Sequence, residues 1–400
     1  MAFLSATLER FGASPTVAMT TRAAALRAGG ADIVALAAGE PDFDTPAHIR
    51  AAAVAAMERG ETRYTAVDGT AELKAAVAEK FVRDNGLTYA PDEITVGSGG
   101  KHVIWNALLA TLEPGDEAIV PAPYWVSYPD MVRFCGAEPV IVPAGPEAGF
   151  RLSAEALEAA ITPRTKWLIL NSPGNPTGAG YRADDLAALA EVLERNPRVH
   201  VLCDDIYEHI AYPGFDFATL AAVAPDLKER ILTVNGVSKA YAMTGWRIGF
   251  AGGPAPLIAA IRKLQSQSTT NPCSISQAAA VAALTGPQDY LAEARAAFLR
   301  RRDFVVGALN AMEGIDCPEP DGAFYVYPSV AGLVGRTSAR GRALDDDRAV
   351  AEALLEEAGV AVVFGSAFGL SPHIRISYAA SDADLARAME RIAGFAEKCR

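Results

Sequence analysis

Short apolar runs alternate with helix-like stretches between residues 94 and 251, and this alternation limits the fold more than any other feature of the sequence. Stretches that favour helices lie between several of the runs, at residues 101–112, 183–195 and 255–265. Strands that alternate with helices form a sheet covered on both faces. We therefore predict an open α/β sheet, mostly parallel, with strands at EITV, EAIV, EPVIV, KWLIL, VHVLC, ILTV and RIGFA.

The loops after these strands hold most of the unusual polar and aromatic residues of the chain. They read GSGGK, PAPYW, NSPGNPTG, DDIYE and NGVSK. In open α/β sheets, ligands bind at the carboxyl ends of the strands, where loops lead into the amino termini of helices. We therefore expect the functional site at this edge of the sheet.

The length of the chain allows more than one structural unit. Its 400 residues, half of them hydrophobic, can bury a large core. Beyond about residue 290, a long charged helix, further apolar runs and a final helix follow the alternating region. We expect this part to form a smaller α/β unit beside the large sheet.

Charge and cysteine content exclude several kinds of partner. The chain carries 48 acidic and 36 basic residues, a net charge of −12, which argues against binding to nucleic acid or to an anionic membrane surface. No stretch reaches the roughly 18 uncharged apolar residues of a membrane span, and Glu9 and Arg10 interrupt the start before a signal-type run develops. The five cysteines are scattered and form no CxxC pair. We expect a cytoplasmic protein with reduced, mostly packed thiols and no metal site.

Lys239 stands after an apolar strand in NGVSKAYAMTGWRIG and precedes Arg247 by eight residues. A free lysine amine has a pKa of about 10.4, so a nucleophilic lysine needs a special setting, such as a carbonyl cofactor. An arginine at position 247 could bind a cofactor phosphate through two hydrogen bonds. A solvated surface lysine is the ordinary alternative.

Asp204 ends the strand VHVLC and is followed by Asp205 and Tyr207. A carboxylate at a buried strand end needs a partner, because its desolvation otherwise costs several kcal/mol. A protonated pyridine nitrogen would supply an attraction on the order of 5 kcal/mol at about 3 Å before desolvation. The alternative is an aspartate that caps the next helix.

The segment GSGGK, between a strand and a helix, offers backbone N–H groups and a helix dipole to a phosphate. It does not match the dinucleotide fingerprint, since His102 stands where the third glycine belongs. It is not a Walker loop either, because no Ser or Thr follows Lys101. Alone, the segment is better explained as an ordinary strand-to-helix turn.

Three further side chains suit a site for a flat, anionic ligand. Trp125 lies on a loop where its ring could stack on a planar cofactor, although core packing is the commoner role. Asn175 lies in a run rich in Pro and Gly that would hold its amide rigidly. Arg375 places a guanidinium inside an apolar strand, where it either grips a carboxylate or forms an internal ion pair.

Over nearly its whole length, the sequence resembles the class I aminotransferases of PLP (pyridoxal 5'-phosphate) fold type I, and it is especially similar to the bacterial aspartate aminotransferase branch. The matching stretches are AAGEPDFDTP, RYTAVDGTAELK, GSGGK, PYWVSYPDMVRF, NSPGNPTG, DDIYEH, NGVSKAYAMTGWRIG, QSTTNP, GAFYV and HIRISYA. The resemblance implies an α/β fold with a large PLP-binding domain over residues 46–290, built on a mostly parallel seven-stranded sheet. It also implies a smaller α/β domain over residues 291–400, joined by the N-terminal segment 1–45.

The resemblance implies a role for each residue around the cofactor ring. Lys239 resembles the lysine that binds PLP covalently and moves a proton at the substrate Cα. Asp204 resembles the partner of the pyridine nitrogen, and Trp125 the aromatic residue on the ring face. Tyr207 and Asn175 resemble the residues that donate hydrogen bonds to the ring oxygen.

The resemblance also implies contacts to the cofactor phosphate and to the substrate. The matching phosphate contacts are Gly99, Gly100, Lys101, Ser238 and Arg247. The substrate contacts are Gly39, Trp125, Asn175 and Arg375, with Arg375 clamping the α-carboxylate. Tyr64 resembles the residue that reaches the phosphate bound by the neighbouring subunit, so the resemblance implies a homodimer with shared sites.

The implied reaction is PLP-dependent transamination, with L-aspartate as the expected amino donor and 2-oxoglutarate as the expected acceptor. The sequence assigns no cation to a substrate side-chain carboxylate, and the aromatic residues Phe43, Tyr64, Tyr124 and Phe364 keep aromatic-amino-acid or prephenate transamination open. A PLP-dependent lyase or decarboxylase stays open as well, because the same fold can break other bonds at Cα.

Overall fold

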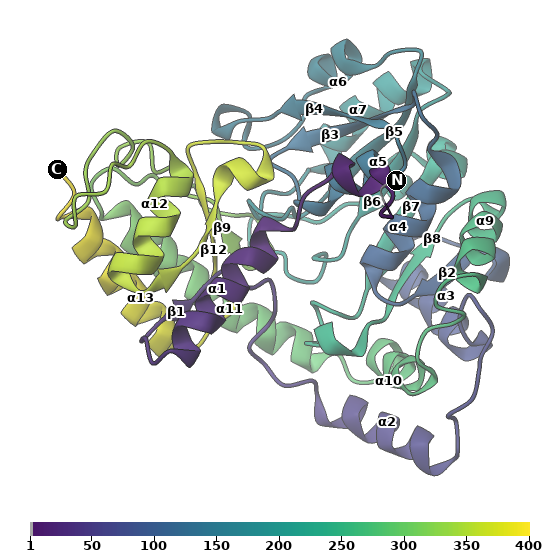
Figure 1. Cartoon of the computed structure of the whole chain (residues 1–400). Helices are drawn as coiled ribbons and strands as arrows, with labels where there is room; N and C mark the ends of the chain where they lie inside the picture. The colour runs from purple at the N-terminus through teal and green to yellow at the C-terminus, as the bar shows by residue number, and fades with distance from the viewer. Residues whose placement is uncertain (1–2) are drawn as a thin grey trace.

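A seven-stranded sheet forms the centre of the chain, of which the computed structural model describes residues 3–400 (Figure 1). The strand order is β2-β8-β7-β6-β5-β3-β4, and β8 alone runs antiparallel to its neighbours. The predicted mostly parallel sheet is therefore confirmed. The strands are β2 (Ile94–Gly97), β3 (Glu117–Ala122), β4 (Glu138–Pro143), β5 (Thr165–Asn171), β6 (His200–Asp204), β7 (Ile231–Gly236) and β8 (Gly249–Gly252).

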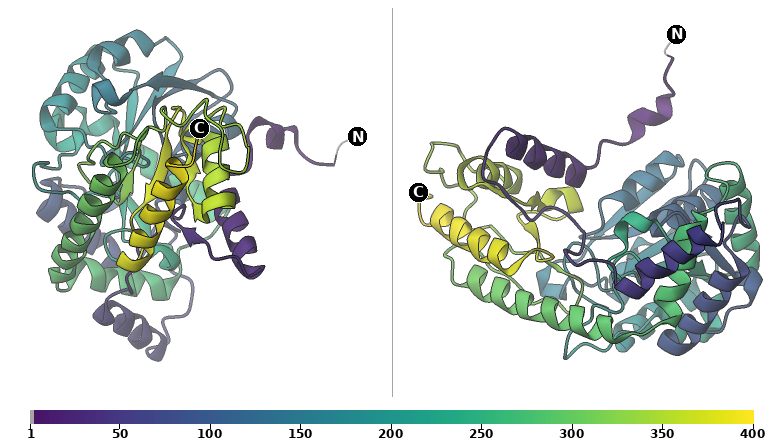
Figure 2. Two further views of the ribbon diagram at one scale, coloured as in Figure 1. Left: turned by 90° about the vertical axis from the view of Figure 1, so that its left-hand side faces the viewer. Right: turned by 90° about the horizontal axis from the view of Figure 1, so that it is seen from below.

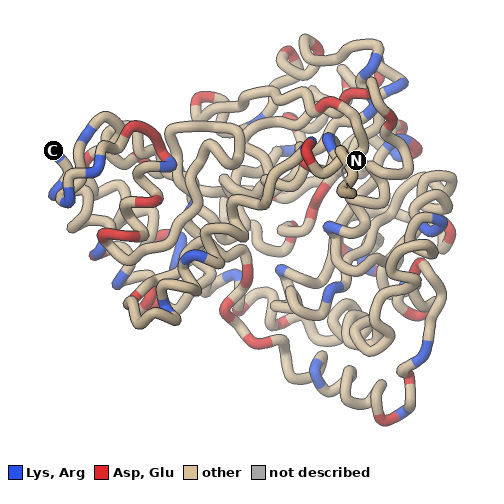
Figure 3. Tube along the Cα trace, viewed as in Figure 1, with Lys and Arg blue, Asp and Glu red and all other residues tan. Residues whose placement is uncertain are grey.

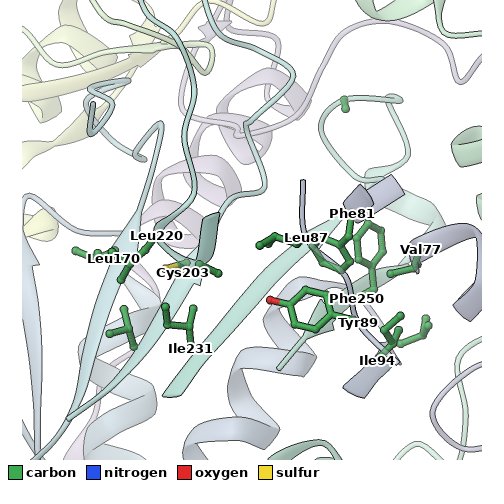
Figure 4. Close-up of a cluster of buried hydrophobic side chains, with 14 of the residues drawn as sticks. Val77, Phe81, Leu87, Tyr89, Ile94, Leu170, Cys203, Leu220, Ile231 and Phe250 are labelled. Atoms are coloured by element: carbon green, nitrogen blue, oxygen red, sulfur yellow. The ribbon is translucent and has the colours of Figure 1, made fainter. Parts of the chain in front are cut away.

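Helices cover both faces of this sheet because its strands are apolar on both sides. In β5, Leu168 and Leu170 belong to one buried cluster, whereas Trp167 and Ile169 belong to another. Figure 4 shows part of the first cluster, in which Leu170 and Cys203 lie near Leu220 and Ile231. The covering helices are α2 (Ala47–Glu58), α3 (Ala71–Asn85), α4 (Gly100–Thr111), α5 (Ser127–Phe134), α6 (Ala154–Ala160), α7 (Ala183–Arg195), α8 (Leu220–Val223), α9 (Ala255–Ser266) and α10 (Ser274–Thr285).

Local signals in the sequence set the ends of these helices. The hydroxyl of Thr70 accepts a hydrogen bond of 3.2 Å from the backbone N–H of Leu73 and caps the start of α3. Gly86, with φ of 65°, adopts the left-handed conformation that ends the helix and that glycine tolerates best. These two signals keep residues 71–85 helical. Lys80 lies in the second half of this helix and is buried.

The carboxyl-terminal part packs around a second core, together with a piece of the amino-terminal segment. Strand β1 pairs in parallel with β10, and Val34 and Leu36 share a buried cluster with residues from 298 to 399. A three-stranded sheet has the order β11-β12-β9. The elements are α1 (Pro15–Ala28), β1 (Val34–Ala35), α11 (Asp289–Asn310), β9 (Tyr325–Val326), α12 (Asp347–Ala353), β10 (Val360–Ala361), β11 (Val363–Phe364), β12 (Ile374–Ser377) and α13 (Asp382–Ala396).

Short helical turns complete the chain, and the first of them lies on the outside of the molecule beside α5, with the amino terminus extending beyond it (Figure 2). Figure 3 shows that basic and acidic residues are interspersed over both parts of the chain. Within residues 3–400, no helix has both the length and the apolar character needed to cross a membrane. The turns are η1 (Ala6–Arg10), η2 (Pro91–Glu93), η3 (Pro146–Ala148), η4 (Pro225–Arg230), η5 (Thr244–Trp246), η6 (Leu354–Ala358) and η7 (Gly365–Phe368).

Candidate active site

A cavity of about 510 Å³ opens at the carboxyl edge of the parallel strands, where Asn171 ends β5 and Asp204 ends β6. This volume suits a small-molecule ligand, since such sites measure roughly 300–1,000 Å³. The edge is the one that the loop sequences predicted. The predicted site residues that line the cavity are Gly39, Gly100, Lys101, Trp125, Asn175, Asp204, Tyr207, Ser238, Lys239, Arg247 and Arg375.

Two predicted site residues do not line this cavity. Gly99 lies beside it: its φ is 89°, and a Cβ at this position would collide with the guanidinium of Arg247. Tyr64 is 88% exposed and stands outside the cavity of its own chain. Its contact with a neighbouring subunit therefore stays a prediction.

The aromatic residues that kept other substrates open do not line the cavity either. Phe364 instead lies beneath the guanidinium of Arg348, whose Cζ is 5.3 Å from the centroid of the Phe364 ring. Tyr124 lines a smaller cavity and Phe43 lines an outer groove. None of these three aromatic rings therefore lines the main cavity of its own chain.

Lys239 follows β7 in a turn that directs its amine into the cavity. Its Nζ donates a hydrogen bond of 2.5 Å to the carbonyl oxygen of Gly39. Burial lowers the pKa of Lys239 to about 8, and the nearby positive charge of Arg375 contributes to the same shift. A substantial fraction of this amine is therefore neutral, and nucleophilic, near neutral pH.

Asp204 is buried at the end of β6, where its carboxylate has one hydroxyl partner. The hydroxyl of Tyr128 donates a hydrogen bond of 2.7 Å to Asp204 Oδ2. Burial raises the pKa of Asp204 to about 6, while the bond from Tyr128 opposes that rise. The sequence analysis missed Tyr128. Its position three residues after Trp125, at the start of α5, is the signal that would have located it.

Arg375 is 1% exposed and has no carboxylate partner among residues 3–400. Its Nη1 donates to Asn175 Oδ1 at 2.9 Å and its Nη2 donates to the carbonyl oxygen of Ala37 at 2.5 Å. Its Nε, also buried, has no hydrogen-bond partner in the described chain. Buried charges are normally paired, so this guanidinium could bind an anion that enters the cavity. The alternative of an internal ion pair is wrong.

Backbone and side-chain donors converge at the start of α4. The first N–H groups of a helix lack partners within the helix and attract anions. Arg247 lies beside this helix start, in a left-handed conformation with φ of 56°, and its Nη1 donates to the carbonyl oxygen of Thr244 at 2.8 Å. A Cβ at Gly249 would collide with the backbone of Gly99 and Gly100, so glycine lets β8 pass close by. The arrangement suits a phosphate group.

Several cavity residues were not singled out from the sequence. Tyr325 and Asn171 line the cavity, as do Thr16 and Thr20 from α1. The hydroxyl oxygens of Tyr325 and Tyr207 lie 2.9 Å apart, which links strand β9 to the turn after β6. These contacts join segments far apart in the sequence, and no local pattern predicts them.

Comparisons with known proteins match almost the full length of the chain. Residues 31–392 match the family described as aminotransferase class I and II. The chain is 61% identical over 395 residues to the aspartate/prephenate aminotransferase of Cereibacter sphaeroides, with 99% of each chain covered. The crystal structure of the aspartate aminotransferase from Rhizobium meliloti matches with a TM-score of 0.97 at 55% identity, and both chains are fully covered.

A more distant solved structure agrees with these matches. The aspartate aminotransferase from Thermus thermophilus with maleate has a TM-score of 0.92 at 46% identity, covering 98% of this chain and 100% of that chain. These matches confirm the family and the fold class predicted from the motifs. On this ground, together with the cavity that its motifs build, the chain belongs to the class I and II aminotransferases.

Proposed function

We propose that this aminotransferase moves the amino group of L-aspartate to 2-oxoglutarate with PLP as its cofactor. The observation that carries the proposal is the placement of a low-pKa amine, a buried carboxyl group and an unpaired guanidinium on the walls of one cavity. These groups belong to Lys239, Asp204 and Arg375. Relatives at 54–61% identity are named aspartate or aspartate/prephenate aminotransferase.

The residues present fit PLP. Tyr128 donates to Oδ2 of Asp204, and this carboxylate lines the cavity, where it can accept a hydrogen bond from a protonated pyridine nitrogen. Trp125 would lie on the ring face, and Tyr207 and Asn175 would bind the ring oxygen. The phosphate would be held by Gly99, Gly100, Lys101, Ser238 and Arg247. When bound, PLP supplies a reactive carbonyl and a ring that withdraws electrons from the substrate Cα.

The chain's own residues bind the substrate and move its proton. The guanidinium of Arg375 binds the α-carboxylate and fixes the position of Cα. Lys239 Nζ, in its neutral form, removes the proton from Cα and can return it as an ammonium group. Asp204 stays ionised beside the pyridine nitrogen, and Tyr128 stabilises that charge through its hydrogen bond.

Lys101 is the available partner for a second carboxylate on the substrate. Of the four cations that line the cavity, Lys239 and Arg375 have other roles and Arg247 lies at the phosphate loop. The Lys101 ammonium lies 4.7 Å from the ring centroid of Trp125 and forms no ion pair with the described residues. Its backbone N–H can serve the phosphate while its side chain binds the carboxylate of aspartate.

Prephenate is a second candidate acceptor. It is a 2-oxo acid with an additional carboxylate, so Arg375 and Lys101 offer it the same pair of cations that they offer aspartate. The relative at 61% identity carries prephenate in its name. A lyase or decarboxylase reaction on the same cofactor would instead release products other than a 2-oxo acid and a new amino acid.

The exposed surface supports a homodimer with shared sites. Tyr64 is 88% exposed in the single chain, and tyrosine is a residue type that is enriched at interfaces between chains. The turn η1, on the outside of the molecule, has no buried residue, and apolar side chains in and before it are exposed. The large exposed side chains include Phe3, Leu4, Leu8, Val54 and Met57. A partner subunit that covers them would bring Tyr64 toward the phosphate site of that subunit.

We further propose the division into segment 1–45, a large domain over 46–290 and a small domain over 291–400, and a cytoplasmic location. The cluster that joins Val34 and Leu36 to the carboxyl-terminal part supports the division. Residues 1 and 2 of the segment 1–45 lie outside the part of the chain that the structure describes. The five cysteines are free thiols, as is usual in the cytoplasm.

An absorbance spectrum followed by product analysis tests the function. The purified protein with PLP should show a band between about 360 and 430 nm that Lys239→Ala removes, because the amine binds the cofactor covalently. Aspartate and 2-oxoglutarate should yield oxaloacetate and glutamate in equal amounts. A wild-type protein that stays colourless with PLP would contradict the proposal, and carbon dioxide or ammonia as the main product would favour the lyase or decarboxylase.

A further inference from the structure

The turn after β6 carries Tyr207 and directly follows Asp204, two residues of the proposed cofactor site, but it has little regular structure. Residues 205–209 belong to no helix or strand. The backbone of the turn forms hydrogen bonds from Glu208 N to Asp205 O at 3.0 Å and from Ile210 N to Tyr207 O at 2.8 Å. Local bonds of this kind do not hold a side chain within the narrow limits that a cofactor site needs. Backbone bonds from Asp205 N to Val234 O at 2.9 Å and from Ala323 N to Ile210 O at 2.8 Å hold the two ends of the turn, and a further contact fixes its centre.

That contact is a buried ion pair between Lys80 of α3 and Glu208 of the turn. Lys80 is 1% exposed and Glu208 is 6% exposed. The side chain of Asn85 binds both members of the pair. Lys80 Nζ donates to Asn85 Oδ1 at 2.6 Å, and Asn85 Nδ2 donates to Glu208 Oε2 at 2.7 Å. Both oxygens of the glutamate are therefore engaged by one helix.

The charges in this cluster support an ionised pair. Burial alone would raise the pKa of Glu208, but Lys80, His209 and Asn85 together hold it below its usual value. The pair fixes Glu208, and the residue before it, Tyr207, lines the cavity. The hydroxyl oxygen of Tyr207 lies 2.9 Å from that of Tyr325. The turn is thus held between α3 and the cofactor cavity.

A metal ion is the alternative occupant of this cluster. Ligand atoms of Asp84, Glu208 and His209 lie within 4.8 Å of one another, as in a metal site. However, the ammonium of Lys80 already contacts Glu208 and lies 4.0 Å from Asp84 Oδ2. A second cation would be repelled at this distance. The lysine takes the place of a metal ion.

We propose that Lys80 and Glu208 are positioning residues that hold Tyr207 and Asp204 in place for the cofactor. This role rests on the proposed PLP-dependent function. The pair touches neither the cavity nor the reacting atoms, and it acts through the backbone of the turn. A pair with only a structural role would stabilise the fold without changing the cofactor site.

The double variant Lys80→Met/Glu208→Leu separates these two roles, because replacing a whole buried ion pair by apolar groups often leaves stability unchanged. We expect its melting temperature to stay close to that of the wild type. Hydrogen exchange at the amides of Glu208 and Ile210 should become about tenfold faster, because the turn loses its tether. The dissociation constant for PLP should rise about tenfold and kcat should fall, since Tyr207 is no longer held in place. The KM for aspartate, which Arg375 governs, should not change.

Lys74→Met is the matched control. It removes another lysine of α3, whose Nζ forms an ion pair of 2.9 Å with Asp68 Oδ2 and does not contact the turn. This variant should keep wild-type exchange at residues 205–210 and wild-type affinity for PLP. A double variant with wild-type exchange and PLP affinity would overturn the proposal.

Glu208→Gln provides an independent test if the double variant does not fold. It keeps the shape of the side chain but removes its charge, so exchange at the turn and the dissociation constant for PLP should both increase. Wild-type values for both would overturn the proposal. Hydrogen exchange is measured on the full chain before and after PLP is added. If the wild type does not bind PLP, the proposed function fails, while the exchange data still test the tether.

Discussion

The hydroxyl of Tyr128 donates a hydrogen bond of 2.7 Å to Asp204 Oδ2, and this contact joins the start of α5 to the end of β6. The two residues lie 76 positions apart in the sequence. A hydrogen bond to a carboxylate stabilises its ionised form and opposes the rise in pKa that burial imposes on Asp204. Tyr128 therefore helps to keep charged the carboxylate that, in the proposed function, faces the pyridine nitrogen of PLP.

Tyr128→Phe should raise the pKa of Asp204 above its present value of about 6. The dissociation constant for PLP should rise about tenfold near neutral pH, because a hydrogen bond to a charged group contributes about 1.5 kcal/mol or more. The loss should be greater at pH 6 than at pH 8, since a protonated Asp204 cannot pair with a protonated ring nitrogen. Titration of the cofactor absorbance at several pH values measures both effects.

Tyr124→Phe is the control for this change, because it removes a hydroxyl from the same loop without removing a contact in the cavity. It should leave PLP affinity unchanged at both pH values. Equal affinities for the wild type and Tyr128→Phe across this range would show that Asp204 does not depend on the hydroxyl.

Arg375→Lys should weaken the binding of every amino-acid substrate. A lysine keeps the charge but loses the planar fork that grips a carboxylate through two hydrogen bonds. We expect the KM for aspartate to rise on the order of 100-fold, with PLP affinity nearly unchanged, because the proposed partner of the arginine is the substrate α-carboxylate rather than the phosphate. Steady-state kinetics with aspartate and with phenylalanine check the result. A large change for only one of the two substrates would place Arg375 at the side chain of the substrate instead.

The sequence predicted the sheet and most of the cavity because both depend on local patterns. All seven apolar runs from EITV to RIGFA are strands, and the helices expected at 101–112, 183–195 and 255–265 end within one residue of α4, α7 and α9. Cavity residues such as Asp204 and Lys239 lie at the end of a strand or in the loop after one, so strand positions were enough to bring them together.

Contacts between distant elements could not be predicted in the same way. Nothing near Lys80 in the sequence distinguishes it from a solvated lysine on the outer face of a helix, yet it is buried against Glu208. Tyr128 likewise has no local feature that identifies Asp204 as its acceptor. Both pairs depend on how α3 and α5 pack against the sheet, which is a property of the assembled fold.

The reactivity of Lys239 should follow its lowered pKa. With a pKa of about 8, roughly a tenth of the amine is neutral at pH 7, and the neutral form is the nucleophile. The rate constant for covalent capture of PLP by the cofactor-free protein should therefore rise with pH and level off above about 8. Stopped-flow absorbance measures the rate. Because burial is the main cause and Arg375 the second, Arg375→Met should move the midpoint upward. A wild-type midpoint near 10 would mean that the amine is solvated.

Substrate choice should depend on Lys101. Lys101→Met removes the cation assigned to the side-chain carboxylate, so kcat/KM for aspartate should fall on the order of 100-fold, the usual effect of losing a close charge pair in a site. The value for phenylalanine, which has no such carboxylate, should change by less than about threefold. Lys166→Met, at the opposite edge of the sheet, is the control and should alter neither value. A parallel loss for both substrates would instead assign the Lys101 side chain to the phosphate, where it would act on every substrate alike. The ratio of the two efficiencies, rather than either value alone, therefore decides the role of this residue.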